Sequence, residues 1–149
     1  MSSLSGVELY WRMGEMGMNQ ENYCSLNVAK RLVDNSIVLE TDFVWRLGAD
    51  GWKLLNKDWV TNMMSNTYES YPAPSFAEIW RELPDEIELE DDGGSIALSV
   101  FKSGKTTYAG YYLNKDEEVY EEKESSNPAD ALAELLIWAK GQKVNHDRP

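Results

Sequence analysis

The chain has one cysteine and one histidine in 149 residues. Cys24 has no second cysteine with which to form an internal disulfide, and the clustered Cys and His ligands of structural zinc sites are absent. His146 lies in a polar C-terminal stretch, so a Ser-His-acid triad could be built only through that tail. The sequence therefore predicts a protein that is not an enzyme, with no catalytic residues, no metal site and no cofactor.

Long apolar runs are also missing. No stretch approaches the roughly 20 residues that a transmembrane helix needs. The longest candidate, 129–139, is too short and contains Asp130 and Glu134. The first ten residues carry neither the basic segment nor the apolar run of a secretory signal. These features predict a cytoplasmic protein with no membrane contact.

Basic residues are scarce, since 14 Lys and Arg stand against 26 Asp and Glu and give a formal net charge of −12. The excess is largest in residues 85–149, where 7 basic residues stand against 15 acidic ones. A surface of this sign repels nucleic-acid phosphates and anionic lipids. Direct nucleic-acid binding is therefore not expected, and a protein, in particular a basic one, is the expected partner.

Apolar and aromatic residues are plentiful, with 42% hydrophobic residues and six Trp, which is typical of a folded domain. Residues 1–22 are Met-rich and irregular, and they predict an N-terminal extension that is either flexible or tucked onto the core. Residues 23–66 predict an α-β-β-α lobe. In that lobe Ser25 caps a first helix, and a hairpin turns at 48–51.

The alternation in residues 39–47 predicts which side chains of the first strand point inward. The apolar residues Leu39, Phe43, Trp45 and Leu47 are expected on the core face, and Arg46 is expected on the opposite face with Glu40 and Asp42. A short helix is expected after the hairpin, with Trp59, Met63 and Met64 directed inward. The polar, proline-bearing segment 65–74 predicts an irregular boundary between two lobes.

Residues 67–141 predict a second lobe with the order α-β-β-β-β-α. Ser75 and Glu78 form a capping box for its first helix. An antiparallel meander follows over 86–123. The last helix, 128–140, is apolar around most of its circumference and is expected to lie buried against the sheet. The prediction is an α+β fold, with the two lobes separate or merged into a single domain and a polar tail over 142–149.

The stretch Ser103–Thr106, Ser-Gly-Lys-Thr, is similar to the end of a phosphate-binding P-loop. That loop needs a glycine at position 99, which is serine here, and a helix after the Lys-Thr pair. The following residues instead predict a strand. We therefore interpret this stretch as a hairpin turn and expect no nucleotide site.

Acidic residues gather in two runs, 85–92 and 116–124. Such acids are most often the solvated side of a strand, and the spacing of an EF-hand calcium loop is absent. As a functional surface, the first run and nearby tyrosines predict a face that binds a protein partner. Its predicted residues are Asp85, Glu86, Glu88, Glu90, Asp91, Asp92, Tyr108, Tyr112 and Tyr120. The competing interpretation divides these tyrosines between core and surface and gives them no function.

Three segments, 23–32, 71–83 and 127–138, resemble in order and spacing short proteins encoded by phages and mobile elements of gut bacteria of the Bacteroides group. The resemblance covers residues 23–141 and implies a mobile-element origin and an intracellular role. It implies no activity, ligand or site residue, because no activity is assigned to those proteins. The layout of residues 95–140 is also similar to that of small antitoxins, as an analogy of layout alone.

The leading hypothesis is therefore a non-enzymatic phage or mobile-element protein that binds another protein through an acidic sheet face. One alternative is a carboxylate-based enzyme or small-ligand binder, which needs a pocket with two acids and aromatic walls such as Trp45 or Trp52. Another alternative is a DNA-mimic inhibitor of a host defence nuclease, which needs carboxylates spaced like phosphates along one ridge.

Overall fold

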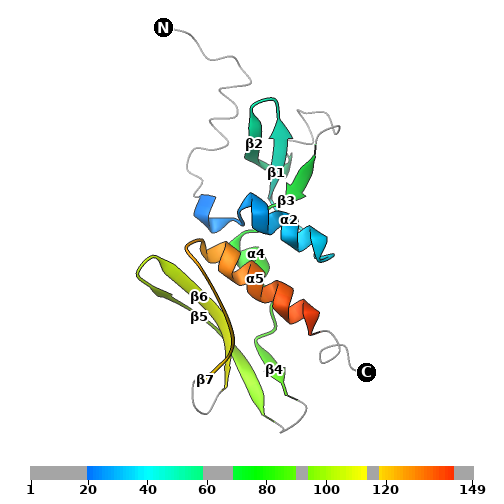
Figure 1. Cartoon of the computed structure of the whole chain (residues 1–149). Helices are drawn as coiled ribbons and strands as arrows, with labels where there is room; N and C mark the ends of the chain where they lie inside the picture. Colours follow the sequence, from blue (N-terminus) through cyan, green and yellow to red (C-terminus); the bar gives the residue numbers. More distant parts are fainter. Residues whose placement is uncertain (1–19, 59–68, 90–93, 114–117, 143–149) are drawn as a thin grey trace.

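The computed structural model describes residues 20–58, 69–89, 94–113 and 118–142. Two antiparallel sheets lie at opposite ends of the molecule, with the helices between and beside them (Figure 1). This arrangement confirms the predicted α+β class. The predicted extension, the helix expected around Met63 and the polar tail lie largely or wholly outside the described residues.

The first sheet has three strands in the order β2-β1-β3. Strands β1 (Phe43–Gly48) and β2 (Gly51–Asn56) form the predicted hairpin, and Gly51 permits its tight turn with a φ of +106°. Strand β3 (Ser70–Pro72) pairs with β1 inside the segment that was predicted to be irregular. Three residues ending in a proline are too few to show an alternating pattern, which is why the sequence did not predict this strand.

The predicted alternation of β1 is confirmed, with Arg46 on the face opposite Phe43, Trp45 and Leu47, but the apolar face is not the more deeply buried one. The buried side chains of this strand are Val44 and Arg46, which are 8% and 2% exposed, whereas its aromatic and leucine residues are only partly buried. Because β1 is the central strand of its sheet, side chains of β2 and β3 flank its own side chains on both faces. Alternation then separates the two faces without showing which one is more deeply buried.

The helices begin where the sequence predicts. Helix α2 (Leu26–Asp34) starts after Ser25, whose hydroxyl accepts a hydrogen bond from the Val28 amide. Helix α4 (Phe76–Trp80) starts with the predicted capping box of Ser75 and Glu78. A short 3-10 helix, η1 (Gln20–Asn22), precedes them.

The second sheet is the predicted meander, with the order β4-β5-β6-β7. Its strands are β4 (Glu86–Glu88), β5 (Ser95–Ser103), β6 (Thr106–Leu113) and β7 (Glu118–Ser125). A hairpin turn at Gly104, with a φ of +61°, joins β5 to β6 where the P-loop-like stretch lies. Helix α5 (Pro128–Gly141) packs on this sheet, and its buried leucines meet Ile96 and Tyr111 in the main core.

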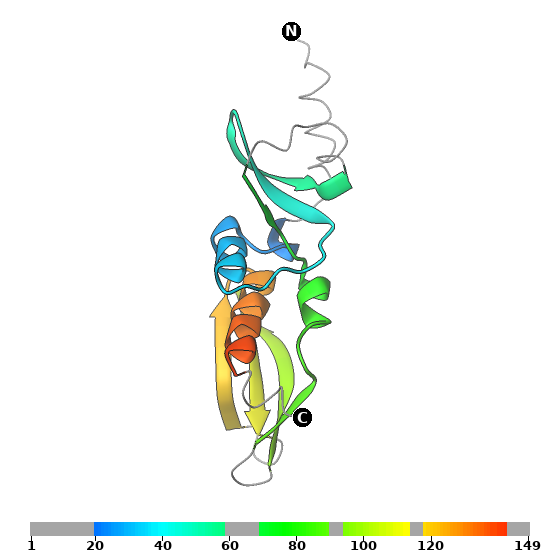
Figure 2. The same cartoon turned by 90° about the vertical axis from the view of Figure 1, so that its right-hand side faces the viewer.

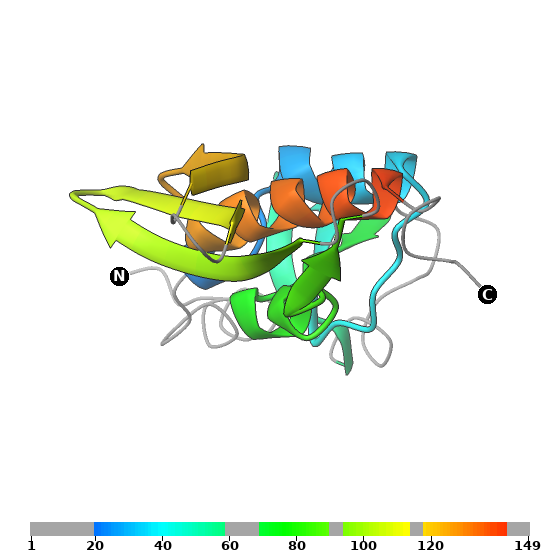
Figure 3. The same ribbon diagram turned by 90° about the horizontal axis from the view of Figure 1, so that it is seen from below.

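Helices α2 and α5 lie side by side (Figure 3). The carboxylate of Asp130 at the start of α5 accepts a hydrogen bond of 2.7 Å from the backbone amide of Ser25. The side-chain amide of Asn127 donates to the carbonyl of Tyr23 at 3.0 Å. These contacts join residues more than 100 positions apart, and the division of the chain into two lobes at residue 67 stays a prediction.

Candidate functional site

The second sheet has an inner face covered by α5 and an outer face that points away from it. On β6, Ala109 and Tyr111 are fully buried toward α5, so alternation directs Tyr108, Gly110 and Tyr112 to the outer face. Residues paired across an antiparallel sheet share a face. The register therefore defines the outer face as Glu86, Glu88, Ser95, Ala97, Ser99, Phe101, Tyr108, Gly110, Tyr112, Val119, Glu122 and Glu124.

Three aromatic rings occupy the middle of the outer face. Phe101 is paired with Tyr108 across β5 and β6, and their rings stack with centroids 5.1 Å apart and an interplanar angle of 13°. The ring of Tyr112 lies 6.4 Å from Phe101 on the other side. Phe101 is 48% exposed, which is unusual for a phenylalanine in a sheet. The rings thus form a solvent-accessible apolar surface on the two central strands.

Carboxylates lie on both edge strands of the outer face, those of β7 beside the stacked rings and those of β4 at the other end, opposite Ala97 and Ser95. Glu86 and Glu88 lie on β4, and Glu122 and Glu124 lie on β7. Two strands separate the rows, which corresponds to about 14 Å at the usual spacing between strands. Lys123 lies on the other face, where its ammonium group is 3.5 Å from the carboxylate of Glu121. The outer-face positions of the described strands thus contain four carboxylates and no lysine or arginine.

The ring of Tyr112 is held in place by its neighbours. Its hydroxyl donates a hydrogen bond of 2.5 Å to the carboxylate of Glu122 on β7. Burial, and secondarily the hydrogen bond and charge of Glu122, raise the pKa of Tyr112 above its usual range, so the phenol remains a donor at neutral pH. The ring lies over Gly110, where an added Cβ atom would lie 3.1 Å from the ring carbon Cζ. This contact requires the glycine.

The predicted partner-binding residues separate into four groups. Glu86, Glu88, Tyr108 and Tyr112 lie together on the outer face. Asp85 is exposed just before β4, whereas Glu90, Asp91 and Asp92 lie outside the described residues. Tyr120 points elsewhere: it is 49% exposed and its ring lies 6.2 Å from that of Trp138 on α5.

The sequence analysis did not select Phe101, Glu122 or Glu124 as site residues. A signal for Phe101 was present, because Ile96, Leu98 and Val100 set the inward phase of β5 and leave Phe101 in the outward phase. Strand β7 has no comparable alternation of apolar residues to indicate which of its side chains point inward. A register shift opposite Tyr111 and Tyr112 leaves Tyr120 unpaired and changes the alternation along this strand.

A second candidate is a hollow of about 750 Å³ beside α4. Its lining includes two acids, Asp42 and Glu78, and two aromatic residues, Phe76 and Trp80, whose rings stack with centroids 6.1 Å apart. This composition is the one expected for a ligand pocket, although neither Trp45 nor Trp52 lines it.

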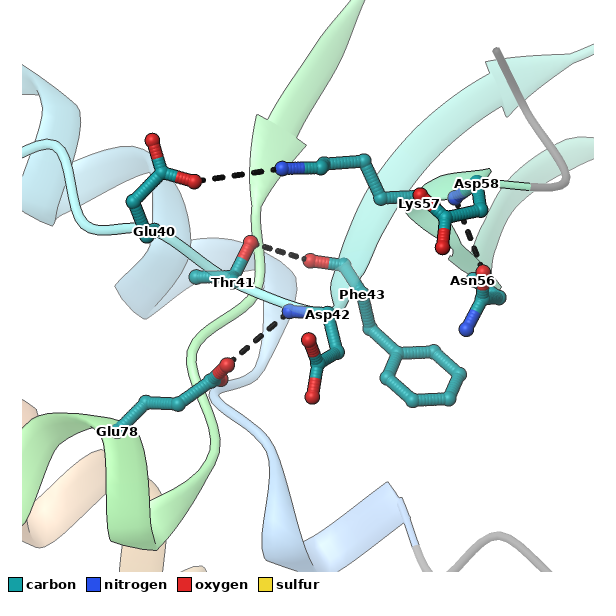
Figure 4. A network of polar contacts seen from close by, with 8 residues as sticks. All are labelled: Glu40, Thr41, Asp42, Phe43, Asn56, Lys57, Asp58 and Glu78. Carbon is teal, nitrogen blue, oxygen red and sulfur yellow. Dashed lines mark hydrogen bonds and ion pairs between the residues drawn. The ribbon is translucent and has the colours of Figure 1, made fainter. Parts of the chain in front are cut away.

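Both oxygens of Glu78 in that hollow accept hydrogen bonds from backbone amides. One oxygen accepts from the Ser75 amide at 2.8 Å, and the other accepts from the Asp42 amide at 3.1 Å, the second of which Figure 4 shows. The carboxylate therefore holds α4 against the segment that leads into β1. Glu78 thus has a structural role, and Asp42 is the second acid that lines the hollow.

Other reactive groups offer no site within the described ranges. Cys24 is fully buried, and burial, with Asp130 as the next cause, raises the pKa of its thiol far above the usual range, which makes the thiolate scarce. Residues 20–58, 69–89, 94–113 and 118–142 contain no group of three His, Cys, Asp or Glu side chains arranged to hold a metal ion. None of the described helices is long and apolar enough to cross a membrane. A comparison of the chain with protein-family models, curated proteins and solved structures gives no match.

Proposed function

We propose that this chain is a non-enzymatic cytoplasmic protein that binds a basic surface of another protein through the outer face of its second sheet. The observation that carries this proposal is the stacked pair of Phe101 and Tyr108, extended by Tyr112, with the carboxylates of β7 beside the pair and those of β4 at the other end of the same face. A mobile-element origin, as the sequence resemblance implies, belongs to the same proposal.

The two kinds of side chain support different parts of recognition. Aromatic rings bury large apolar areas and attract cations to their faces, with about 0.5–2 kcal/mol for each well-placed cation. The carboxylates raise the association rate with a basic partner and disfavour acidic ones. A lysine or arginine side chain that crosses this face would meet a ring and a carboxylate together, as at the adjacent pair of Tyr108 and Glu124.

The arrangement favours protein binding over the two alternatives. A DNA mimic needs carboxylates along one ridge, whereas the outer-face acids of β4 and β7 form two rows with aromatic rings between them. A small-ligand binder needs free polar groups in its pocket, whereas Glu78 is engaged with backbone amides. The hollow beside α4 therefore supports a small-ligand binder more weakly than the outer face supports a protein-binding function.

Fluorescence anisotropy with labelled Arg-rich, Lys-rich and acidic peptides of equal length tests the proposal. Two outer-face variants are compared with wild type: Phe101→Ala with Tyr108→Ala, and Glu88→Gln with Glu124→Gln. The control, Asp34→Asn with Glu69→Gln, removes two exposed charges from the other half of the molecule.

We expect the basic peptides to bind, with weaker affinity at high salt. Each outer-face variant should lose about tenfold in affinity, which corresponds to about 1.4 kcal/mol, and the control should stay close to wild type. Equal losses in the control and in the outer-face acid variant would show attraction by net charge alone and would refute the proposal. Equal binding of acidic and basic peptides would also refute it.

A further inference from the structure

Strand β7 leaves one long edge of the second sheet open. It pairs with β6 on one side only, and no hydrogen bond from the described residues reaches the backbone of its other edge. Figure 2 shows β7 as the margin of the sheet, with no strand beyond it. With eight residues, β7 is the longest edge strand of the two described sheets, and none of its residues is buried. Such an edge is a template for a further strand.

The charge of β7 restricts what can pair with it. Four carboxylates, Glu118, Glu121, Glu122 and Glu124, accompany a single ammonium group, that of Lys123. A second copy of the same strand would place carboxylates opposite carboxylates, which is unfavourable across a strand pair. A strand that carries lysine or arginine would place opposite charges across from each other. The edge therefore disfavours self-association and favours a basic strand.

We propose that the basic partner binds as an extended segment that adds a fifth strand to the sheet at the open edge of β7. This inference rests on the proposed function and specifies the conformation and charge of the partner. Backbone hydrogen bonds to the edge would provide affinity, and alternate side chains of the added strand would provide specificity. The register of β7 with β6 is unbroken from Glu121 to Ser125, so this part offers the most regular pairing.

The side chains of such a strand would extend the outer face. Positions that share the outer face with Glu122 and Glu124 would carry the basic residues, since these two acids point to that face. Basic residues one position along would instead face the Glu121 side, where Lys123 already lies 3.5 Å from that carboxylate. Alternating basic and neutral residues are thus the preferred pattern of the partner segment.

The test uses the full chain and two labelled peptides of eight alternating Lys and Thr residues. The second peptide carries methyl groups on two adjacent central backbone nitrogens, which removes a donor from each of its edges and leaves its charge unchanged. Affinity is measured by anisotropy at low salt, and amide hydrogen exchange of β7 is measured with and without each peptide. A peptide of alternating Glu and Thr is the charge control.

We expect the unmethylated peptide to bind and to slow exchange at β7 amides, and the methylated peptide to bind at least about tenfold more weakly. Equal affinity of the two Lys peptides without slower exchange at β7 would overturn strand addition and leave the proposed function intact. Failure of both Lys peptides to bind, or equal binding of the Glu peptide, would contradict both proposals.

Discussion

The hydroxyl of Tyr112 on β6 donates a hydrogen bond to the carboxylate of Glu122 on the neighbouring strand β7, and the ring of Tyr112 lies over Gly110. The missing side chain of Gly110 is what allows this arrangement. An added Cβ atom at this position would lie 2.6 Å from the carbonyl oxygen of Glu121 and 3.0 Å from the hydroxyl of Tyr112. The first of these contacts involves backbone and cannot be relieved by a side-chain rotation.

Gly110→Ala is therefore expected to destabilise the protein, by about 1–3 kcal/mol, as is usual when a well-packed site is overfilled. Urea unfolding followed by tryptophan fluorescence measures the change. Gly141→Ala is the matched control, because nothing lies within 4 Å of an added Cβ atom at that helical position. The control should keep or slightly increase stability. Wild-type stability of the Gly110→Ala variant would contradict the close approach of the Glu121 backbone to Gly110.

A second prediction concerns Glu78, whose carboxylate joins α4 to the segment that leads into β1. Glu78→Ala removes both acceptors and leaves the amides of Ser75 and Asp42 without this partner. We expect a loss of about 1–3 kcal/mol in the free energy of unfolding and faster hydrogen exchange at the Asp42 amide. Glu82→Ala, at an exposed position close behind α4, should change neither quantity. Unchanged exchange at Asp42 in the Glu78 variant would contradict the role assigned to this carboxylate.

The features that the sequence predicted correctly are those with local causes. Ser25, Ser75 and Asn127 cap their helices through hydrogen bonds to amides three residues later, so short segments contain the whole signal. The strands of the meander follow from alternation and turn residues within each hairpin. The inward position of α5 follows from its apolar circumference.

The features that were missed depend on residues distant in sequence. Arg46 is 2% exposed on the central strand of its sheet, between the strands of residues 51–56 and 70–72. The hollow beside α4 is lined by Asp42, by residues of that helix and by Val100. These three segments are distant in sequence, so no local pattern predicts that they lie together. The sequence shows two acidic runs, but only the strand order shows that β5 and β6 separate the acids of β4 from those of β7.

A third prediction concerns pH and Asp130. Burial raises the pKa of this carboxyl, and the hydrogen bonds from Ser25 only partly oppose the shift. The folded protein therefore holds this proton more tightly than the unfolded chain does. The stabilising contribution is complete below the unfolded pKa, and it is lost as the pH rises through the folded pKa.

Asp130→Asn keeps an oxygen acceptor for the Ser25 amide and does not ionise. The stability of this variant relative to wild type should therefore increase as the pH is raised from about 3 to about 6, across and above the ordinary titration range of an aspartate. Urea unfolding at several pH values measures this difference. A difference for Asp130→Asn that stays constant with pH would contradict the raised pKa.

The last prediction uses Cys24 to test whether the two lobes unfold together. Its amide donates to the Pro74 carbonyl at 3.0 Å, its carbonyl accepts from the Trp45 indole at 2.8 Å, and its thiol lies 3.6 Å from the Ala129 carbonyl. The residue is fully buried between Trp45 of the first sheet and Ala129 of α5. Exposing the thiol therefore requires contacts to both halves of the chain to break.

We expect thiol-specific labelling of the native protein to be slow, with a free energy of opening equal to that of global unfolding in urea. Asp34→Cys provides the internal control, because its added thiol is exposed and should react at once while Cys24 does not. An opening free energy well below the global value would show that one lobe opens while the other stays folded. Equality of the two values would show that the chain unfolds as one cooperative domain.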